Sequence, residues 1–350
     1  MGKNSRYYKD LQKAKTAKIR EIQDQLPLYT GGYIDSCIRN HRINTAYEYA
    51  SDVLLFFRFL TAKNPRCKNK KTNEIPLDIL EALNCEDINE FQSYMKASDG
   101  IRSHMVSDRT LARKMASMRS FFAYMAEKDF ISDDPTLKAD KNKKLVENDI
   151  KRLSTDEANR LIHAVKETKA ATNRSCARSR NVSKRDLAIV TLFLNTGIRV
   201  SECVGMDVSD VDFVKNTIKI VRKGGKETHL YMNKNVQETL RDYIQNERPL
   251  LTDDPKEKAL FLSLKRNRMA VRSIEAMLKK FKTSAGISDN VSPHTLRRTY
   301  GTTLYNKTGD IYMVADVLGH KDVNTTVKHY AAMDEEHKKS AAEVNLYDGD

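Results

Sequence analysis

Apolar residues recur at intervals of three and four along most of this chain, the spacing that places them on one face of an α-helix. The pattern is clearest between Leu26 and Asp129, where the segments 47–60 and 111–125 carry it. It returns from Asn235 and continues toward the end of the sequence. Helices with one apolar face bury that face against each other, so the first part of the chain is expected to form a helical bundle.

One stretch of the chain breaks the helical pattern. Residues 217–221 (Thr-Ile-Lys-Ile-Val) and 227–232 are rich in residues that favour strands, and Gly224-Gly225 lies between them. Two such runs around a Gly-Gly pair predict a β-hairpin with Lys223 at its tip. The expected fold class is therefore mostly α with a small β-sheet (α+β).

The length of 350 residues predicts two domains or one large one. The segment SDDPTLKADKNKKLVEND combines a proline with dense charge, which is typical of an interdomain linker and places the boundary within 132–150. The expected parts are a basic lead-in (1–25), a helical domain (26–131), the linker (132–150), a mixed α/β domain (151–335) and a C-terminal tail (336–350).

Charge and cysteine content indicate which partners and which cellular compartment to expect. There are 61 Lys and Arg against 47 Asp and Glu, a net charge of +14, which favours a polyanionic partner such as nucleic acid or an anionic membrane surface. No run of ~18 apolar residues and no apolar leader is present, so membrane insertion and secretion are not expected. Five scattered cysteines without a Cys-x-x-Cys pair indicate reduced thiols, which predicts a cytoplasmic protein and no structural zinc site.

Two segments are strongly basic. Residues 1–25 hold seven Lys and Arg against three acidic residues, and this run is either a solvated helix face or an arm that tracks DNA. Residues 166–185 hold seven against Glu167 alone, which predicts an exposed basic loop.

The residues that suggest chemistry are cationic groups, imidazoles and one tyrosine in the second half of the chain, while phosphate-loop, dinucleotide, zinc-protease and serine-hydrolase motifs are absent. Each has an ordinary explanation when taken alone. A surface salt bridge with Glu202 accounts for an arginine at 199, and a lysine at a hairpin tip is usually solvated. In chain order the set is Arg199, Lys223, His294, Arg297, His320 and Tyr330.

The ordered set resembles the active site of the tyrosine recombinases, the phage-integrase family. The motifs that carry the resemblance are NTGIRVSE, VRKGGKE, SPHTLRRTYG, LGHKDVNTT and VKHYA, and they span about 153–332. In the first domain, NTAYEYASDVLLFFRFL and SDRTLARKMASMRSFFAYMAEKDFISDDP look like the family's core-binding helices. The stretch 166–185 is longer than the family's usual connection. Before the core-binding helices, an additional arm-site domain is not expected.

The resemblance implies a site-specific DNA recombinase that forms a 3′-phosphotyrosyl intermediate and a Holliday junction, in integration, excision or resolution. Phosphoryl transfer on DNA develops negative charge on the non-bridging oxygens, and positioned cations stabilise it. Arg199 and Arg297 suit that role because a guanidinium stays charged and matches phosphate geometry.

The remaining roles follow from the same resemblance. A tyrosine hydroxyl with a pKa of ~10 needs a base, and a departing 5′-oxygen needs a proton. Tyr330 is the implied nucleophile, His294 the base, Lys223 the general acid and His320 a hydrogen-bond donor to the phosphate. The phosphotyrosine retains the bond energy, so neither a metal nor a nucleotide cofactor is expected.

DNA binding is expected to be shared between the two domains. On the first domain the basic residues beside an apolar stripe are either DNA contacts or ordinary surface charge: Arg102, Arg109, Arg113 and Lys114. On the second domain three arginines are expected at the start of a helix that the family places in the major groove: Arg266, Arg268 and Arg272.

The expected partners are double-stranded DNA recombination sites, three further copies of the chain in a homotetramer on DNA, and an accessory directionality factor. The tail after Tyr330 is either a frayed terminus or a helix that docks on a neighbouring subunit. Two alternative functions stay open at this point. One is a type IB topoisomerase-like enzyme that relaxes DNA, and the other is a non-catalytic DNA-binding protein on the same scaffold.

Overall fold

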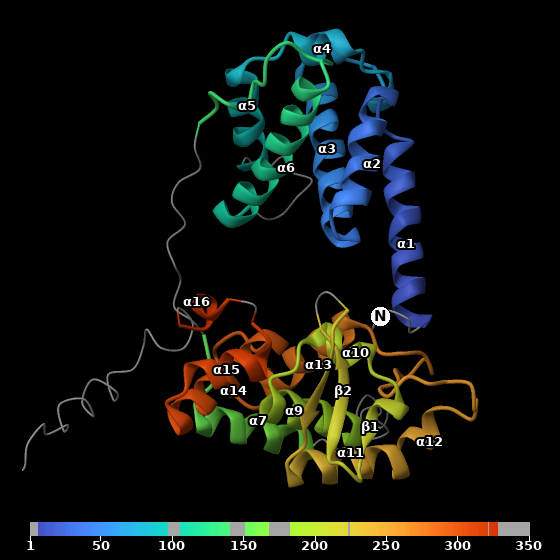
Figure 1. Cartoon of the computed structure of the whole chain (residues 1–350), viewed down its shortest axis with the longest axis vertical. Helices are drawn as coiled ribbons and strands as arrows, with labels where there is room; N and C mark the ends of the chain where they lie inside the picture. Colours follow the sequence, from blue (N-terminus) through green and yellow to red (C-terminus); the bar gives the residue numbers. More distant parts are fainter. Residues whose placement is uncertain are drawn as a thin grey trace, which may run out of the picture. The chain divides into compact units, whose positions relative to one another are not determined.

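A computed structural model of the chain describes residues 6–96, 106–140, 151–167, 183–222, 225–320 and 322–327. These residues form two compact units, one within 6–140 and one within 151–327 (Figure 1). The described part is mostly helical and contains one small sheet, which confirms the predicted fold class. No helix in these ranges combines the length and the apolar character needed to cross a bilayer.

Helices are the only regular secondary structure among the described residues of the first unit. They are α1 (Arg6–Gln23), η1 (Leu28–Thr30), α2 (Gly31–Asn40), α3 (Ile43–Lys63), η2 (Pro65–Cys67), η3 (Thr72–Glu74), α4 (Leu77–Glu81), α5 (Cys85–Lys96) and α6 (Asp108–Glu127). Helix α6 begins where Ser107 caps it, since the Ser107 hydroxyl accepts a hydrogen bond from the Thr110 amide at 3.3 Å.

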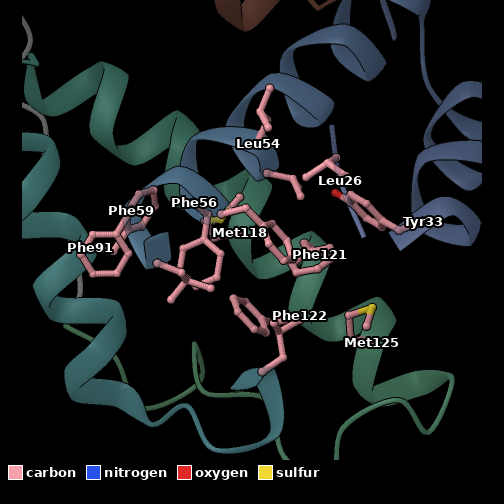
Figure 2. Close-up of a cluster of buried hydrophobic side chains, with 14 of the residues drawn as sticks. Leu26, Tyr33, Leu54, Phe56, Phe59, Phe91, Met118, Phe121, Phe122 and Met125 are labelled. Atoms are coloured by element: carbon pink, nitrogen blue, oxygen red, sulfur yellow. The ribbon is translucent and has the colours of Figure 1, made fainter. Parts of the chain in front are cut away.

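The core of the first unit is aromatic. The ring of Phe56 on α3 lies 5.1 Å from that of Phe91 on α5 and 5.4 Å from that of Phe122 on α6, between centroids, and both pairs meet edge to face. Figure 2 shows these rings with Phe59 and Phe121 in one cluster. Such pairs add about 0.5–1.5 kcal/mol each beyond area burial. The cluster therefore joins α3, α5 and α6, and α3 and α6 cover the two segments whose apolar pattern predicts helices.

Helix α1 lies within the basic lead-in and packs against α3. Ile19 is fully buried, and the Lys15 ammonium lies 5.2 Å from the centroid of the Tyr47 ring on α3. The opposite side of α1 is exposed, with Lys9 and Lys13 on it. This geometry is that of a solvated helix face, and the DNA-tracking role of the same face stays a prediction.

The segment 131–140, most of which was predicted to be linker, packs against the first unit. Ile131 and Ala139 are buried in its core. The Asp140 amide donates to the Asn89 side chain at 2.9 Å, and the Asp140 carbonyl accepts from Gln92 at 3.1 Å. These contacts make 131–140 part of the first unit, although its charge pattern resembles a linker.

The second unit surrounds a small sheet with helices. Its elements are α7 (Thr155–Glu167), α9 (Ser183–Thr196), α10 (Val200–Gly205), η4 (Val208–Asp210), β1 (Val211–Asp212), β2 (Thr217–Val221), β3 (Glu227–Tyr231), α11 (Lys234–Asn246), α12 (Arg248–Leu251), α13 (Val271–Ser284), α14 (Pro293–Thr308), α15 (Ile311–Leu318) and α16 (Val323–Thr326). In Figure 1 this unit is coloured from green to red.

The sheet is antiparallel with the strand order β1-β2-β3. Strands β2 and β3 pair from Thr217 opposite Tyr231 to Val221 opposite Glu227, so the predicted hairpin is confirmed. The Gly225 amide donates to the Arg222 carbonyl at 2.9 Å inside the connecting turn. Lys223 and Gly224 lie outside the described residues.

The end of the basic stretch 166–185 is not an exposed loop. Lys184 and Arg185 belong to the first turn of α9, and Arg185 is buried. The Glu247 carboxylate accepts the amides of both residues at 2.8 and 2.9 Å, and Asp186 pairs with the Arg185 guanidinium. Arg185 in the first turn of α9 is buried because the Glu247 carboxylate, from a distant segment, caps the helix N-terminus. The local charge pattern does not reveal this contact.

Candidate active site

Arg199 is the residue that caps the start of α10. Its guanidinium donates to the Glu202 carboxylate at 2.9 Å, and its own amide donates to the other oxygen of that carboxylate at 2.9 Å. The Glu202 side chain is 4% exposed and that of Arg199 is 30% exposed. A buried carboxylate therefore orients an arginine whose tip still reaches solvent, so the salt bridge expected from the sequence also serves to aim the guanidinium.

The turn before Arg199 requires glycine. Gly197 has a φ of +59°, and a Cβ atom at this position would lie 2.6 Å from Tyr300 Cδ1 and 2.7 Å from Leu318 Cδ2. The close approach brings the end of α9 against α14 and α15.

Arg297 lies in the second turn of α14 and is buried. Helix α14 begins at Pro293 because the Ser292 hydroxyl accepts the Thr295 amide at 3.1 Å. The Arg297 guanidinium donates to the Gly197 carbonyl at 2.5 Å and to the Leu318 carbonyl. Arg199 in turn donates to the Gly319 carbonyl at 3.0 Å. Two arginines that are distant in the chain thus meet at the same turn after α15.

His320 follows that turn directly. Helix α15 ends at Leu318 and is capped by Gly319, which adopts a left-handed conformation with a φ of +64°. The His320 amide then donates to the Ala315 carbonyl at 2.9 Å. Nδ1 of His320 lies 2.8 Å from the hydroxyl of Thr326, a fully buried residue of α16. This contact fixes the orientation of the imidazole beside Arg199 and Arg297.

Sequence reasoning missed a third arginine at this turn. Arg222 at the end of β2 donates to the carbonyls of Asp316 at 2.9 Å and Val317 at 2.6 Å. Four successive carbonyls, from residue 316 to residue 319, therefore accept hydrogen bonds from three arginines of three different elements. The only sequence signal for Arg222 was its position next to Lys223.

The other predicted catalytic residues are less completely described. His294 lies in the first turn of α14, one turn before Arg297, and its side chain is exposed. Lys223 and Tyr330 lie outside the described residues, so their roles stay predictions.

Family models match both parts of the chain. The model described as the phage integrase family matches residues 151–337, which is more than half of the sequence. The chain belongs to this family. The model described as the phage integrase N-terminal SAM-like domain matches residues 36–129. The resemblance found from the catalytic motifs and the first-domain helices is confirmed.

Curated relatives of this phage integrase family member are tyrosine recombinases. XerC from Caldanaerobacter subterraneus subsp. tengcongensis is 30% identical over 325 residues, which cover 89% of this chain and 84% of XerC. XerS from Streptococcus mutans serotype c is 28% identical over 354 residues, which cover 92% of this chain and 97% of XerS. The predicted enzyme class is confirmed, and these relatives give no support to the topoisomerase or the non-catalytic alternative.

Solved structures with a similar fold include recombinases bound to DNA. XerH bound to a palindromic difH substrate in a post-cleavage complex has a TM-score of 0.61 and 19% identity, over 86% of this chain and 79% of that chain. A lambda integrase dimer bound to a COC′ core site has a TM-score of 0.58 and 16% identity, over 86% and 93%. At these identities the likeness shows a shared fold.

The candidate DNA-binding residues of the first unit differ in their surroundings. Arg109 near the start of α6 is exposed. Arg113 and Lys114 instead bind the buried carboxylate of Asp52 on α3, with N–O distances of 2.7 and 2.6 Å, and the Ser117 hydroxyl donates to the same carboxylate at 2.8 Å. These two cations hold α6 against α3, while Arg102 lies outside the described residues.

The three arginines expected at the start of one helix lie in two places. Only Arg272 is on α13, whose first residue is Val271, and it is exposed. Arg266 is exposed in the turn before the helix, with a φ of +61°. Arg268 donates to the carbonyls of Val204 and Met206 at 3.0 and 2.7 Å and pairs with Asp207. The predicted common helix start is wrong because a tight turn at 263–267 delays the helix.

Proposed function

We propose that this chain is a site-specific DNA recombinase that cuts and rejoins DNA through a 3′-phosphotyrosyl intermediate and a Holliday junction. The observation that carries the proposal is the meeting of Arg199, Arg297 and His320 at the turn after α15. Cationic donors held in place by buried contacts are what a phosphodiester transition state requires. The names of the XerC and XerS relatives support the same activity.

The reaction proposed here is a transesterification in which no bond energy is lost. The Tyr330 hydroxyl attacks the scissile phosphorus, a bond from Tyr330 Oη to phosphorus forms, and the bond from phosphorus to O5′ breaks. His294 takes the phenolic proton and Lys223 gives a proton to O5′. The 5′-hydroxyl of a second strand then attacks the phosphotyrosine, which restores a diester and releases Tyr330.

Arg199 and Arg297 stabilise the negative charge that develops on the phosphate during this step. As phosphorus becomes five-coordinate, negative charge grows on the two non-bridging oxygens, where guanidinium groups bind it in bidentate fashion. Glu202 holds the Arg199 tip in place, so this residue needs little reorganisation when the phosphate arrives. His320, held through Nδ1 by Thr326, adds a hydrogen bond from its other ring nitrogen.

Both units are proposed to contact double-stranded DNA recombination sites. The exposed side chains Arg109, Arg266 and Arg272 are the described candidates for direct contact. Arg113, Lys114 and Arg268 support the surfaces from which those contacts are made, since their charges are paired with Asp52 and Asp207. On DNA the protein is proposed to act as a homotetramer, with an accessory directionality factor, in the cytoplasm at the nucleoid.

Strand exchange is the result that tests the function. Incubated with DNA that flanks its own gene, the protein is expected to form covalent adducts at one short sequence and to join two copies of that sequence. Sequencing of adducts and products measures both. Relaxation of supercoiled DNA at many sequences without joined products would show a topoisomerase-like activity and contradict the proposal.

Lys223→Ala is expected to slow cleavage of ordinary DNA by about 10²-fold or more, because the departing 5′-oxygen no longer receives a proton. A substrate with sulfur in place of the bridging 5′-oxygen should restore the rate, since a thiolate leaves without a proton. Single-turnover cleavage on both substrates measures this. A variant that is equally slow on the sulfur substrate would remove Lys223 from the general-acid role.

A further inference from the structure

Arg222 joins two segments of the second unit that are distant in the chain. Its backbone closes the turn of the β2–β3 hairpin, since its amide donates to the Lys226 carbonyl at 2.8 Å and its carbonyl accepts the Gly225 amide at 2.9 Å. Its side chain crosses to the end of α15 and donates to the carbonyls of Asp316 and Val317 at 2.9 and 2.6 Å. One residue therefore fixes the base of the hairpin to the turn that precedes His320.

The end of α15 is shaped to receive this side chain. The last carbonyls of a helix have no partner within the helix and carry the negative end of its dipole, so a guanidinium there is favourable. Gly319 lies against Arg222, and a Cβ atom at Gly319 would collide with Nη1 of the arginine. The glycine thus provides both the left-handed turn and the space through which Arg222 reaches the carbonyls.

The favourable contacts of Arg222 with the helix end are opposed by its burial and by a neighbouring positive charge. Its side chain is half-buried, and its Nε is buried with no hydrogen-bond partner among the described residues. Burial lowers the pKa of Arg222, and the neighbouring Arg199 lowers it further, while the Glu202 carboxylate acts in the opposite direction. A second guanidinium beside Arg199 adds positive charge where a phosphate is proposed to bind. Such an arrangement is typical of a functional site rather than a stabilising one.

We propose that Arg222 is a positioning residue that ties the base of the β2–β3 hairpin to the Gly319 turn and acts on cleavage through Lys223, the next residue of the chain. The inference rests on the general-acid role proposed above for Lys223. The hairpin base and the His320 turn are held together by two hydrogen bonds from one planar group, so their relative position depends on the guanidinium of Arg222.

The test compares Arg222→Met with the unchanged protein. Methionine keeps an unbranched apolar stem but removes the donors to Asp316 and Val317. Cleavage of ordinary DNA is expected to slow by about 10-fold to 100-fold, the effect of a displaced catalytic group. On the substrate with a bridging 5′-sulfur, the rate should return to that of the unchanged protein, because the proton from Lys223 is no longer needed.

The matched control is Arg248→Met. Arg248 is also half-buried and donates to backbone carbonyls, those of Glu257 and Ala259, at 2.8 to 3.1 Å, but it lies at the start of α12. Its loss is expected to lower the unfolding temperature without changing the ratio of the rates on oxygen and sulfur substrates. Arg222→Lys, which can keep one of the two hydrogen bonds, should cleave ordinary DNA at an intermediate rate.

The outcomes separate this inference from the proposed function. If sulfur restores Lys223→Ala but not Arg222→Met, the arginine does not act through the general acid and the inference is overturned. An Arg222→Met protein that cleaves ordinary DNA at the unchanged rate also overturns it. If sulfur restores neither variant, Lys223 is not the general acid, and the inference that rests on this role is overturned with it. Sulfur rescue of both variants, with an unaltered ratio for Arg248→Met, supports the inference.

Discussion

Tyr330→Phe is expected to bind DNA as the unchanged protein does and to form no covalent adduct. The substitution removes only the phenolic oxygen, which is the atom proposed to bond to phosphorus, so the loss should be complete rather than partial. Binding should persist because many Lys and Arg side chains contact the backbone of DNA. Denaturing gels of nicked substrates measure the adduct, and gel shifts measure binding.

Three tyrosines of the second unit serve as controls for this assignment. Tyr300 is half-buried, and burial raises the pKa of its hydroxyl, which makes it a poorer source of phenolate. Tyr305 and Tyr312 lie on α14 and α15, and Tyr312 is exposed. Phenylalanine at each of these three positions should leave the adduct in place. An adduct that persists in Tyr330→Phe and disappears in one of the controls would move the nucleophile to that tyrosine.

Periodic patterns were sufficient to predict much of the fold. The apolar spacing of 47–60 and 111–125 predicts helices, and α3 and α6 cover both segments with those residues in the aromatic core. The Gly-Gly pair between two β-rich runs predicts the β2–β3 hairpin, and the register joins them residue by residue. These features depend on neighbours within a few positions of the chain, which is why a single sequence reveals them.

Charged residues were predicted less well, because their partners are distant in the chain. Arg113 and Lys114 look like surface charge on α6, yet both pair with Asp52, which lies 61 positions earlier than Arg113 in the sequence. Arg268 likewise bonds to the end of α10 across 62 positions. A local pattern interprets each cation as solvated. Only the packing of two elements shows that such a cation pairs with a buried carboxylate or donates to the free carbonyls of a helix end.

The candidate site shows the same division. The order of motifs identified Arg199, Arg297 and His320, and the structure brings these three to one turn. The order of motifs did not identify Arg222, because nothing in the motif VRKGGKE shows that its arginine reaches the end of α15. The cap that Arg222 forms on α15 depends on tertiary geometry. Gly319, which makes room for it, is already explained by its local role as the residue that ends the helix.

Arg297→Ala and Arg199→Ala are each expected to slow DNA cleavage by on the order of 10²-fold or more, the effect of deleting one positioned charge contact to a transition state. Binding should fall much less, because other cations carry it. Single-turnover cleavage rates and gel shifts on one substrate measure both effects. The bridging 5′-sulfur should not restore either variant, since their defect concerns the non-bridging oxygens.

Part of the slower cleavage in Arg297→Ala is expected to come from a loosened turn. A second substrate separates this structural effect from the loss of charge stabilisation. Alanine leaves the carbonyls of Gly197 and Leu318 without their donor, at a cost of about 1–3 kcal/mol for each buried group, so the turn itself is expected to loosen. A scissile methylphosphonate replaces one charged oxygen with methyl, and less negative charge then develops in the transition state. If the arginines stabilise that charge, this substrate should narrow the gap between each alanine variant and the unchanged protein. An equal gap on both substrates would show that the arginines only hold the turn together, and it would remove them from the catalytic site.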